Sequence, residues 1–474
     1  MIRATLMRMA RRWHARLRWP AGIALVCWVV SGITHPLMVW TGPQAENMRP
    51  PQLSFDVDTW RENLPALSGL VITEAAVVPT AQGAMLRTSG TTDAEVTYWQ
   101  HGNLQNYSDR DQATWLSRHY LGTERTNPDA LESVTLVTEF SPNYPAVNRL
   151  LPVWRVEYSG SLHAFVHTET ASLALIGNNQ KQALQRVFQW LHTHSYLSHW
   201  PWLQFLVSLI LVVSLLVFAL AGTVLVFAMP KRRSIQPAAR RWHRRGALLL
   251  YVPLLALSLS GFYHLVYTHF DDTVPGQLQL ATPALYAGDL DALLAGLQPF
   301  DGVDVQQSSL VTTLDGETYI RLQHTRADAP QTREDRFVGH AAYQQVTYIG
   351  QGAATNDESV ARAYATTVRE DEPQNIQQIN RFGGLYDFRN KRLPVWQATY
   401  VDEVIFIDPA RQVLIERVSR PEQWERWSFS TLHKWNFMTP FIGRNNRDIL
   451  LLTLLCGFLL MLVAGVLIAR SRRP

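Results

Sequence analysis

The sequence predicts an integral membrane protein with four transmembrane helices in two parallel repeats, and with two α+β domains outside the membrane. Three observations predict this fold class. The chain has four long apolar runs without charged residues, its basic clusters lie at the ends of these runs, and an internal repeat relates its two halves. Hydrophobic residues make up 47% of the 474 positions, a high share for a soluble enzyme.

The four apolar runs span residues 20–40, 205–229, 246–267 and 449–469, and none contains Asp, Glu, Lys or Arg. A helix of about 20 residues crosses a hydrocarbon layer of roughly 30 Å, so we expect four transmembrane helices. The first run, behind an Arg-rich start, has the layout of a signal peptide. It is too long for one, and no small-residue cleavage site follows residues 31–36, so we interpret it as a retained helix.

The basic residues predict the orientation. Segments 1–20, 231–245 and 470–474 carry 16 Lys and Arg and no Asp or Glu, which indicates that both termini and the central loop are cytoplasmic. The two long segments outside then hold 27 basic and 39 acidic residues, a balance of about −12. The Arg clusters flank membrane spans, so the lipid bilayer is the expected partner and nucleic acid is not. Cys27 and Cys456 lie inside apolar runs, so no disulfide framework is expected.

These observations divide the chain into nine segments. They are a cytoplasmic tail (1–19), TM1 (20–40), outer domain 1 (41–204), TM2 (205–229), a cytoplasmic loop (230–245), TM3 (246–267), outer domain 2 (268–448), TM4 (449–469) and a cytoplasmic tail (470–474).

A sequence match at an offset of 229 residues relates the halves. Arg-Arg-Trp-His occurs at 11–14 and 240–243, Ser-Gly at 31–32 and 260–261, and a His at 35 and 264. Arg-Leu-Leu-Pro-Val-Trp at 149–154 matches 392–396 with one extra Leu, and Leu-His at 191–192 matches 432–433. Because the first helix of each half starts in the cytoplasm, we expect a pseudo-twofold axis along the membrane normal. Equivalent histidines then face one another at equal depth.

The outer segments are expected to be α+β. Residues 359–368 are typical of a helix, and 394–400, 404–407 and 413–418 of strands, with a turn at Asp408-Pro409-Ala410. In the first half, 153–158 and 162–167 predict a hairpin around Ser159-Gly160, while 168–171 replace the Asp-Pro-Ala turn. The earlier part of each segment shows no clear pattern.

Histidines at matched positions in the two halves are the candidate site residues. A histidine in or beside a transmembrane helix indicates function by default, and imidazole is a common axial ligand of haem iron. Facing helices of a bundle supply such ligands. Within the first helix of each half the two histidines are 21 residues apart, which is about 31 Å of rise with phases about 60° apart. The candidate ligands of haem b are His14, His35, His192, His243, His264 and His433.

Simpler roles are also available to these residues. His14 and His243 could be interfacial cations, and His35 and His264 could be hydrogen-bonded between helices without metal. His192 and His433 could be purely structural, and His194 or His199 could replace His192.

Several other chemistries fit poorly. The sequence has no phosphate-binding glycine loop, dinucleotide fingerprint, Cys-x-x-Cys pair or His-Glu-x-x-His motif. The cytoplasmic segments are too short to fold around a flavin or a nicotinamide. Electrons that enter from inside therefore need a separate donor, either a soluble reductase or a membrane quinol.

The repeated Arg-Arg-Trp-His, Ser-Gly and Arg-Leu-Pro-Val-Trp motifs and the Asp408-Pro409-Ala410 turn resemble the PepSY-associated transmembrane family over nearly the whole chain. Within that family the chain looks most like the di-haem siderophore reductases of the bacterial inner membrane. The resemblance implies two PepSY-like periplasmic domains, two b-type haems and an oxidoreductase activity. It implies reduction of a ferric siderophore, or another Fe(III) chelate, in the periplasm, with release of Fe(II).

Two ligand arrangements remain open. One haem at each membrane face would use His14, His35, His243 and His264, whereas two periplasmic haems would pair His35 and His264 with His192 and His433.

Two other functions are alternatives. The first is a haem-free, membrane-anchored PepSY module that binds or inhibits a periplasmic protein. The second is an iron or siderophore permease, which the scarcity of charged residues in the spans disfavours.

Overall fold

The computed structural model describes residues 2–68, 70, 72–90, 96–228, 238–271, 277–280, 287–297, 305–325, 344–350 and 355–470. Residues 229–237 of the expected TM2 end and cytoplasmic loop, and 471–474 of the expected tail, lie outside the described residues. The chain forms two compact units. A helical unit contains residues 1–42, 179–273 and 421–474, and a sheet unit contains 43–178 and 274–420.

Among the described residues, four helices are long and apolar enough to cross a membrane, which indicates a membrane protein and agrees with the four predicted spans. The spans cover Arg18–Thr41, Pro201–Ala228, Arg240–Phe270 and Asn436–Ala469. The helices of this unit are α1 (Ile2–Arg16), α2 (Arg18–Thr41), α5 (Asn179–His192), α6 (Pro201–Ala228), α7 (Ala238–Phe270), α11 (Arg420–Ser428) and α12 (Thr439–Arg470).

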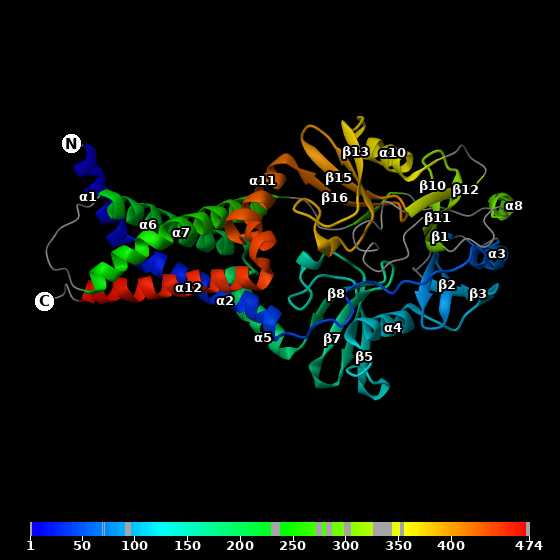
Figure 1. Ribbon diagram of the computed structural model, residues 1–474, viewed down its shortest axis with the longest axis horizontal. Helices are drawn as coiled ribbons and strands as arrows, with labels where there is room; N and C mark the ends of the chain where they lie inside the picture. The colour runs from blue at the N-terminus through cyan, green and yellow to red at the C-terminus, as the bar shows by residue number, and fades with distance from the viewer. Residues whose placement is uncertain are drawn as a thin grey trace. The chain divides into compact units, whose positions relative to one another are not determined.

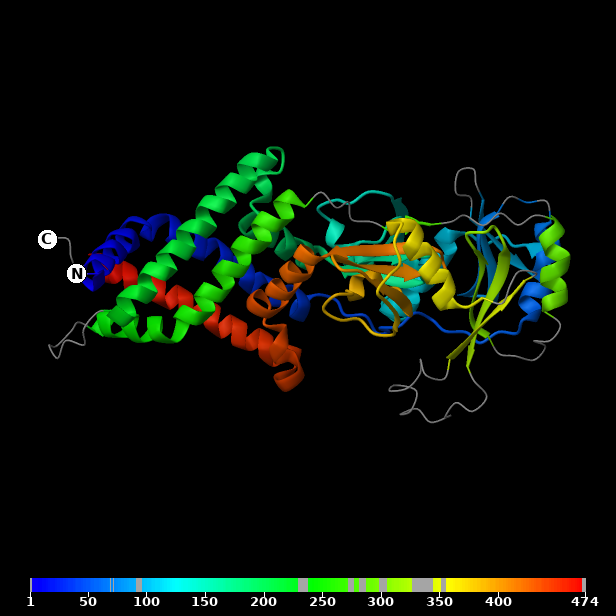
Figure 2. The ribbon, with the colours of Figure 1, turned by 90° about the horizontal axis from the view of Figure 1, so that it is seen from above.

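The long helices form a bundle in which α2 contacts α6 and α12, and α7 contacts the same two helices (Figures 1 and 2). Small buried residues of α2, including Ala24 and Ser31, allow the neighbouring helices to approach closely. The chain leaves the bundle for the sheet unit after α2 and α7 and returns before α6 and α12. We call this end of the bundle the sheet-side end, and the opposite end the terminal end.

The sheet unit contains three antiparallel sheets. The seven-stranded sheet has the order β12-β11-β10-β1-β2-β3-β4, the five-stranded sheet β13-β14-β15-β16-β9 and the four-stranded sheet β5-β6-β7-β8. In the first half the strands are β1 (Ile72–Thr80), β2 (Gly83–Gly90), β3 (Val96–Gln100), β4 (Asn103–Leu104), β5 (Leu131–Val137), β6 (Val153–Tyr158), β7 (His163–His167) and β8 (Ser172–Gly177).

In the second half the strands are β9 (Leu278–Gln279), β10 (Val305–Thr312), β11 (Thr318–Thr325), β12 (Gln344–Ile349), β13 (Asn375–Ile379), β14 (Val395–Thr399), β15 (Glu403–Asp408) and β16 (Val413–Ser419). The helices of the unit are α3 (Asp58–Asn63), α4 (Asp109–Leu121), α8 (Ala287–Gly296) and α10 (Asp357–Arg369). The predicted helix at 359–368 and the strands β6, β7, β14, β15 and β16 are confirmed, whereas β1–β4 and β10–β12 had no clear sequence signal.

The seven-stranded sheet contains strands from both halves of the chain. Its centre is the antiparallel pair of β1 with β10, in which Ala76 lies opposite Ser309. Ala76 also pairs with Arg87 of β2, and Ser309 with Arg321 of β11. Strands β1–β3 of the first half and β10–β12 of the second half therefore meet edge to edge around two corresponding residues. The sequence divided the outer segments at 41–204 and 268–448, but residues 179–200 and 421–438 lie in the helical unit.

Local geometry in the sheet unit matches between the halves. Tyr144 donates its hydroxyl hydrogen to the carbonyl of Leu150 at 2.8 Å, and Tyr386 does the same to Arg392 at 2.9 Å. Left-handed backbone at Arg149 precedes β6, and left-handed backbone at Lys391 precedes β14. Leu150 thus corresponds to Arg392, and Arg149 corresponds to Lys391. The Leu at 150 is therefore not an insertion. Arg149 and Arg392, which the sequence match aligned, occupy different structural positions.

Candidate functional site

The six candidate histidines fall into two groups at opposite ends of the bundle. His14 on α1 and His243 on α7 lie at the terminal end. His35 on α2, His264 on α7, His192 at the end of α5 and His433 at the end of a π-helical turn (Phe429–His433) lie at the sheet-side end. A turn at Leu17 separates α1 from α2, so the spacing argument within one helix applies directly only to α7.

The terminal-end pair is held by the two returning helices. Nδ1 of His14 lies 3.4 Å from the carbonyl oxygen of Phe218 on α6, and the ring stacks on the Phe218 ring at 4.0 Å between centroids. The ring of His243 lies near the backbone of Met461 on α12, 243 residues after Phe218, and its Nδ1 is buried without a hydrogen-bond partner among the described residues. Both imidazoles therefore face the backbone of a returning helix.

A glycine lies against each imidazole of this pair. A Cβ atom on Gly222 of α6 would lie 3.5 Å from Cε1 of His14, and one on Gly465 of α12 would lie 3.6 Å from Cε1 of His243. Each glycine is four residues beyond the backbone group that its histidine faces, so it lies one helical turn along the same face. The absence of a side chain at these positions leaves space beside both rings.

The four sheet-side histidines form one cluster with two phenylalanines. Phe188 stacks on His192 at 4.6 Å between centroids and lies 6.0 Å from His35. Phe429 stacks on His433 at 4.9 Å and on His264 at 4.3 Å. The rings of His192 and His433 lie 6.1 Å apart and are nearly perpendicular. The motif Phe-x-x-Leu-His at 188–192 and 429–433 is the sequence signal for this arrangement, of which only Leu-His had been recognised.

Polar groups on other helices engage Nδ1 of two histidines in this cluster. Nδ1 of His192 lies 2.9 Å from the hydroxyl of Ser31, and Trp28 donates its indole hydrogen to the carbonyl of His192. Nδ1 of His264 lies 2.5 Å from a carboxylate oxygen of Glu425. Engaging Nδ1 leaves Nε2 available as a ligand. Sequence reasoning missed Ser31 as a partner and missed Glu425 altogether, because partners from different segments have no common spacing.

Burial keeps the histidines outside the spans neutral. It lowers the pKa of His192 to about 3, with the neighbouring His433 and His264 adding to the effect, and it lowers the pKa of His433 to about 4. The pKa of His14 is also lowered, mainly by burial and further by His243. Neutral imidazole is the form that binds metal. These sites are therefore ready for metal binding without losing a proton first.

Two other histidines near the cluster differ in their surroundings. His194 is buried, its Nδ1 lies 3.1 Å from the hydroxyl of Ser208 on α6, and its Nε2 is buried without a hydrogen-bond partner among the described residues. His199 is exposed. His194 thus remains an alternative to His192 by its free Nε2, whereas exposure makes His199 a poor ligand candidate.

The donor set fits haem. It consists of imidazoles grouped at the two ends of an apolar bundle, and Nδ1 of both His243 and His433 is a buried nitrogen without a hydrogen-bond partner among the described residues. Gly222 beside His14 and Gly465 beside His243 have no side chain, which leaves room for a flat macrocycle next to each ring. Within the described ranges, no group of three or more His, Cys, Asp or Glu side chains is arranged to hold a bare metal ion.

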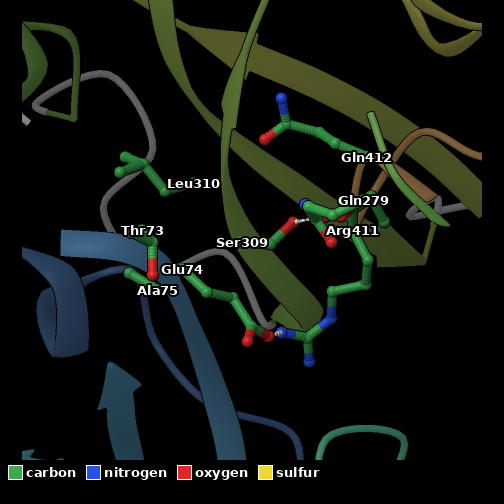
Figure 3. Close-up of a pocket in the computed structure, with 9 residues that line it drawn as sticks. Thr73, Glu74, Ala75, Gln279, Ser309, Leu310, Arg411 and Gln412 are labelled. Atoms are coloured by element: carbon green, nitrogen blue, oxygen red, sulfur yellow. Dashed lines mark hydrogen bonds and ion pairs between the residues drawn. The ribbon is translucent and has the colours of Figure 1, made fainter. Parts of the chain in front are cut away.

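A shallow surface recess lies elsewhere, in the sheet unit between β1, β10 and the turn that precedes β16 (Figure 3). Arg411 crosses it and donates to a carboxylate oxygen of Glu74 at 2.5 Å. No candidate histidine is among its lining residues. Its charged side chains pair with each other, so it offers no free group for a ligand.

Comparison with known proteins adds no relative to these observations. The sequence matches no family model, and no curated protein matches it significantly.

Proposed function

We propose that the protein is a haem-containing oxidoreductase of the bacterial inner membrane that carries electrons from the cytoplasmic side, or from the quinol pool, to Fe(III) chelates in the periplasm. The single observation that carries this proposal is the grouping of six imidazoles at the two ends of one apolar bundle. A pair at one end and four at the other would allow electrons to cross the membrane between sites.

The resemblance to the PepSY-associated transmembrane family supports the same function and suggests a ferric siderophore as the substrate. The matched geometry of the halves supports two parallel repeats. It includes the β1–β10 pair, the two tyrosine hydrogen bonds and the two Phe-x-x-Leu-His segments. With parallel repeats, both termini are cytoplasmic and the sheet unit is periplasmic.

Haem b, when bound, would supply the one-electron chemistry. The candidate histidines would hold it, Ser31 and Glu425 would orient His192 and His264, and the surrounding apolar residues would exclude water. Iron is the substrate at the periplasmic face. One electron converts Fe(III) to Fe(II), which the hard oxygen donors of a siderophore bind less tightly, so the metal is released.

The first experiment measures haem. The full-length protein, expressed with added haem and purified in detergent, is expected to show a b-type reduced-minus-oxidised spectrum. Single alanine variants of the four axial histidines are each expected to lose one haem equivalent. The two candidate histidines outside the ligand set are expected to keep the wild-type content, as is the exposed control His199→Ala. Variants that lose the same equivalent identify an axial pair and decide between the two ligand arrangements. Wild-type protein without any b-type signal would contradict the proposal.

The second experiment measures electron transfer. Protein reduced in nanodiscs is mixed with ferric trihydroxamate, tris-catecholate or citrate complexes in the presence of a chromogenic Fe(II) chelator. Haem oxidation and Fe(II) appearance are expected at equal rates and in a one-to-one ratio. Haem that stays reduced with every complex would contradict the reductase function while leaving the haem site intact.

A further inference from the structure

The four sheet-side histidines differ in what their Nδ1 atoms meet. His192 meets a neutral hydroxyl, that of Ser31, at 2.9 Å, and His264 meets the carboxylate of Glu425 at 2.5 Å. Nδ1 of His433 is buried without a hydrogen-bond partner among the described residues. In the part of the chain that the structure describes, His264 is the one member of the cluster with a carboxylate at hydrogen-bond distance.

Glu425 is a buried carboxylate, with 9% of its side chain exposed. Among the described residues its ion-pair partner is His264, and no Lys or Arg lies within ion-pair distance. A buried carboxylate is costly unless a donor compensates it. The N–H at Nδ1 of His264 is that donor, so the pair determines the tautomer of the ring and directs Nε2 away from α11.

Contacts on both sides hold the pair in place. Tyr263 donates its hydroxyl hydrogen to the carbonyl of Pro421 at 3.1 Å, and Ser260 donates to the carbonyl of Ser428 at 3.2 Å. These hydrogen bonds join α7 to α11 at either side of Glu425. Phe429 stacks on the His264 ring at 4.3 Å between centroids, while 40% of the His264 side chain stays exposed.

The first half of the chain lacks the equivalent carboxylate. The offset of 241 residues that relates Phe188 to Phe429 and His192 to His433 places Leu184 of α5 at the position of Glu425. Two halves that match in their histidines thus differ in the group that would set the charge around the ligand.

We propose that Glu425 is a positioning residue for His264 that lowers the reduction potential of the haem this histidine holds, so that the two haems are electronically different. The inference rests on the proposed function. A carboxylate that accepts from the ligand makes the imidazole a stronger electron donor. Its negative charge in an apolar site also favours Fe(III), the more positive state, over Fe(II).

The test is a spectroelectrochemical titration of the haem-loaded, full-length protein in nanodiscs. Glu425→Gln keeps the size and an acceptor oxygen but removes the charge. We expect it to shift the reduction equilibrium of the haem that His264 holds about tenfold towards Fe(II), which is about 59 mV for one electron, and to leave the other haem unchanged. The low-spin EPR signal of that same haem is expected to move.

Two variants serve as references. Glu425→Leu introduces the residue type found at Leu184, the corresponding position of the first half. It is expected to shift the reduction potential of the same haem at least as far, or to cause the loss of that haem alone. Glu422→Gln removes another carboxylate of the same helix, one that pairs with Arg426 rather than with a histidine, and is expected to leave both potentials unchanged.

The outcomes separate the two proposals. If Glu425→Gln keeps its full haem content and its reduction potentials are unchanged, the proposed role of Glu425 is overturned. The proposal that the protein binds haem is not contradicted by that result. Loss of all haems together in Glu425→Gln would indicate a general structural role and would also overturn it. Wild-type protein without b-type haem would contradict the proposed function itself.

Discussion

At the residue scale, the structure shows which side chains hydrogen-bond to or stack on the candidate histidines. The sequence had identified these histidines without their partners. The six histidines were found because they recur at matched positions, yet Ser31, Glu425, Phe188 and Phe429 were not assigned to them. A hydrogen bond such as that between Glu425 and His264 joins positions 161 residues apart. No local period encodes such a pair, so only folding brings it together.

A buried ion pair in the sheet unit supports the first prediction. Arg321 donates to both carboxylate oxygens of Asp357, at 2.8 and 2.7 Å, and both side chains are buried. Asp357→Asn leaves the guanidinium without its counter-charge and is expected to destabilise the sheet unit by about 3–5 kcal/mol. Glu358→Gln, on the exposed pair with Arg362, is the matched control, with an expected change below about 1 kcal/mol.

Urea unfolding of the full-length protein in detergent, followed by tryptophan fluorescence, measures this difference. Equal midpoints for the two variants would contradict it.

His167 in the sheet unit supports a second prediction, on pH. Burial lowers its pKa to about 4, although Glu169 opposes the shift. The folded state therefore favours the neutral ring, and between pH of about 6.5 and 4 the unfolded chain binds more protons. Stability is fully present above pH 6.5 and falls as the pH drops through this window, by about 3 kcal/mol.

His167→Asn preserves a polar partner for Thr170, whose hydroxyl lies 2.8 Å from Nδ1 of the histidine. The variant is expected to lose this part of the pH dependence. The carboxylates with lowered pKa, such as Asp109, are common to both proteins and cancel in the comparison. Parallel stability curves for wild type and variant from pH 7 to 4 would argue against the role of His167.

At the scale of elements, two kinds of contact relate the halves of the chain. Helix packing accounts for the positions of two glycines, and strand pairing joins the two halves of the seven-stranded sheet. Gly222 and Gly465 face His14 and His243 from α6 and α12, and β1 and β10 join at their edges. The sequence match covered the first helix, the strand motif and one Leu-His pair of each half. The structure extends the correspondence to the returning helices, where hydrophobic residues are interchangeable and leave little similarity.

The third prediction concerns these two glycines. In the arrangement with one haem at each membrane face, Gly222→Val places a branched side chain against His14 and is expected to release the terminal-end haem while the sheet-side haem remains. Gly465→Val is expected to release the same haem through His243. Gly457→Val on α12, whose Cβ would meet Leu250 rather than a histidine, is the control for packing alone. Haem content per protein and the reduced spectrum measure the result, and normal haem content in both histidine-facing variants would contradict it.

At the scale of the whole molecule, four apolar helices and two compact units define the protein. Basic residues gather at the terminal end of the bundle, in segments 1–20 and 240–245 among others. Because cytoplasmic loops carry an excess of Lys and Arg, this distribution predicts the terminal end to be cytoplasmic and the sheet unit to be periplasmic.

Cysteine labelling tests this fourth prediction. In a background with Cys27→Ala and Cys456→Ala, Ala4→Cys is expected to react with a membrane-impermeant maleimide only after the cells are opened. Glu124→Cys, at an exposed position of the sheet unit, is expected to react in cells whose outer membrane alone has been permeabilised. The reverse pattern would show that the orientation is inverted.

The amino-acid sequence by itself determined the four spans, the six histidines and several strands of the sheet unit. These features depend on local hydrophobicity and on exact recurrence, which are both visible along one chain. The joined seven-stranded sheet, the grouping of the histidines and the partners of their second nitrogens were decided only by the tertiary structure. They depend on contacts between distant segments, where the energy comes from pairing and burial rather than from any pattern in sequence.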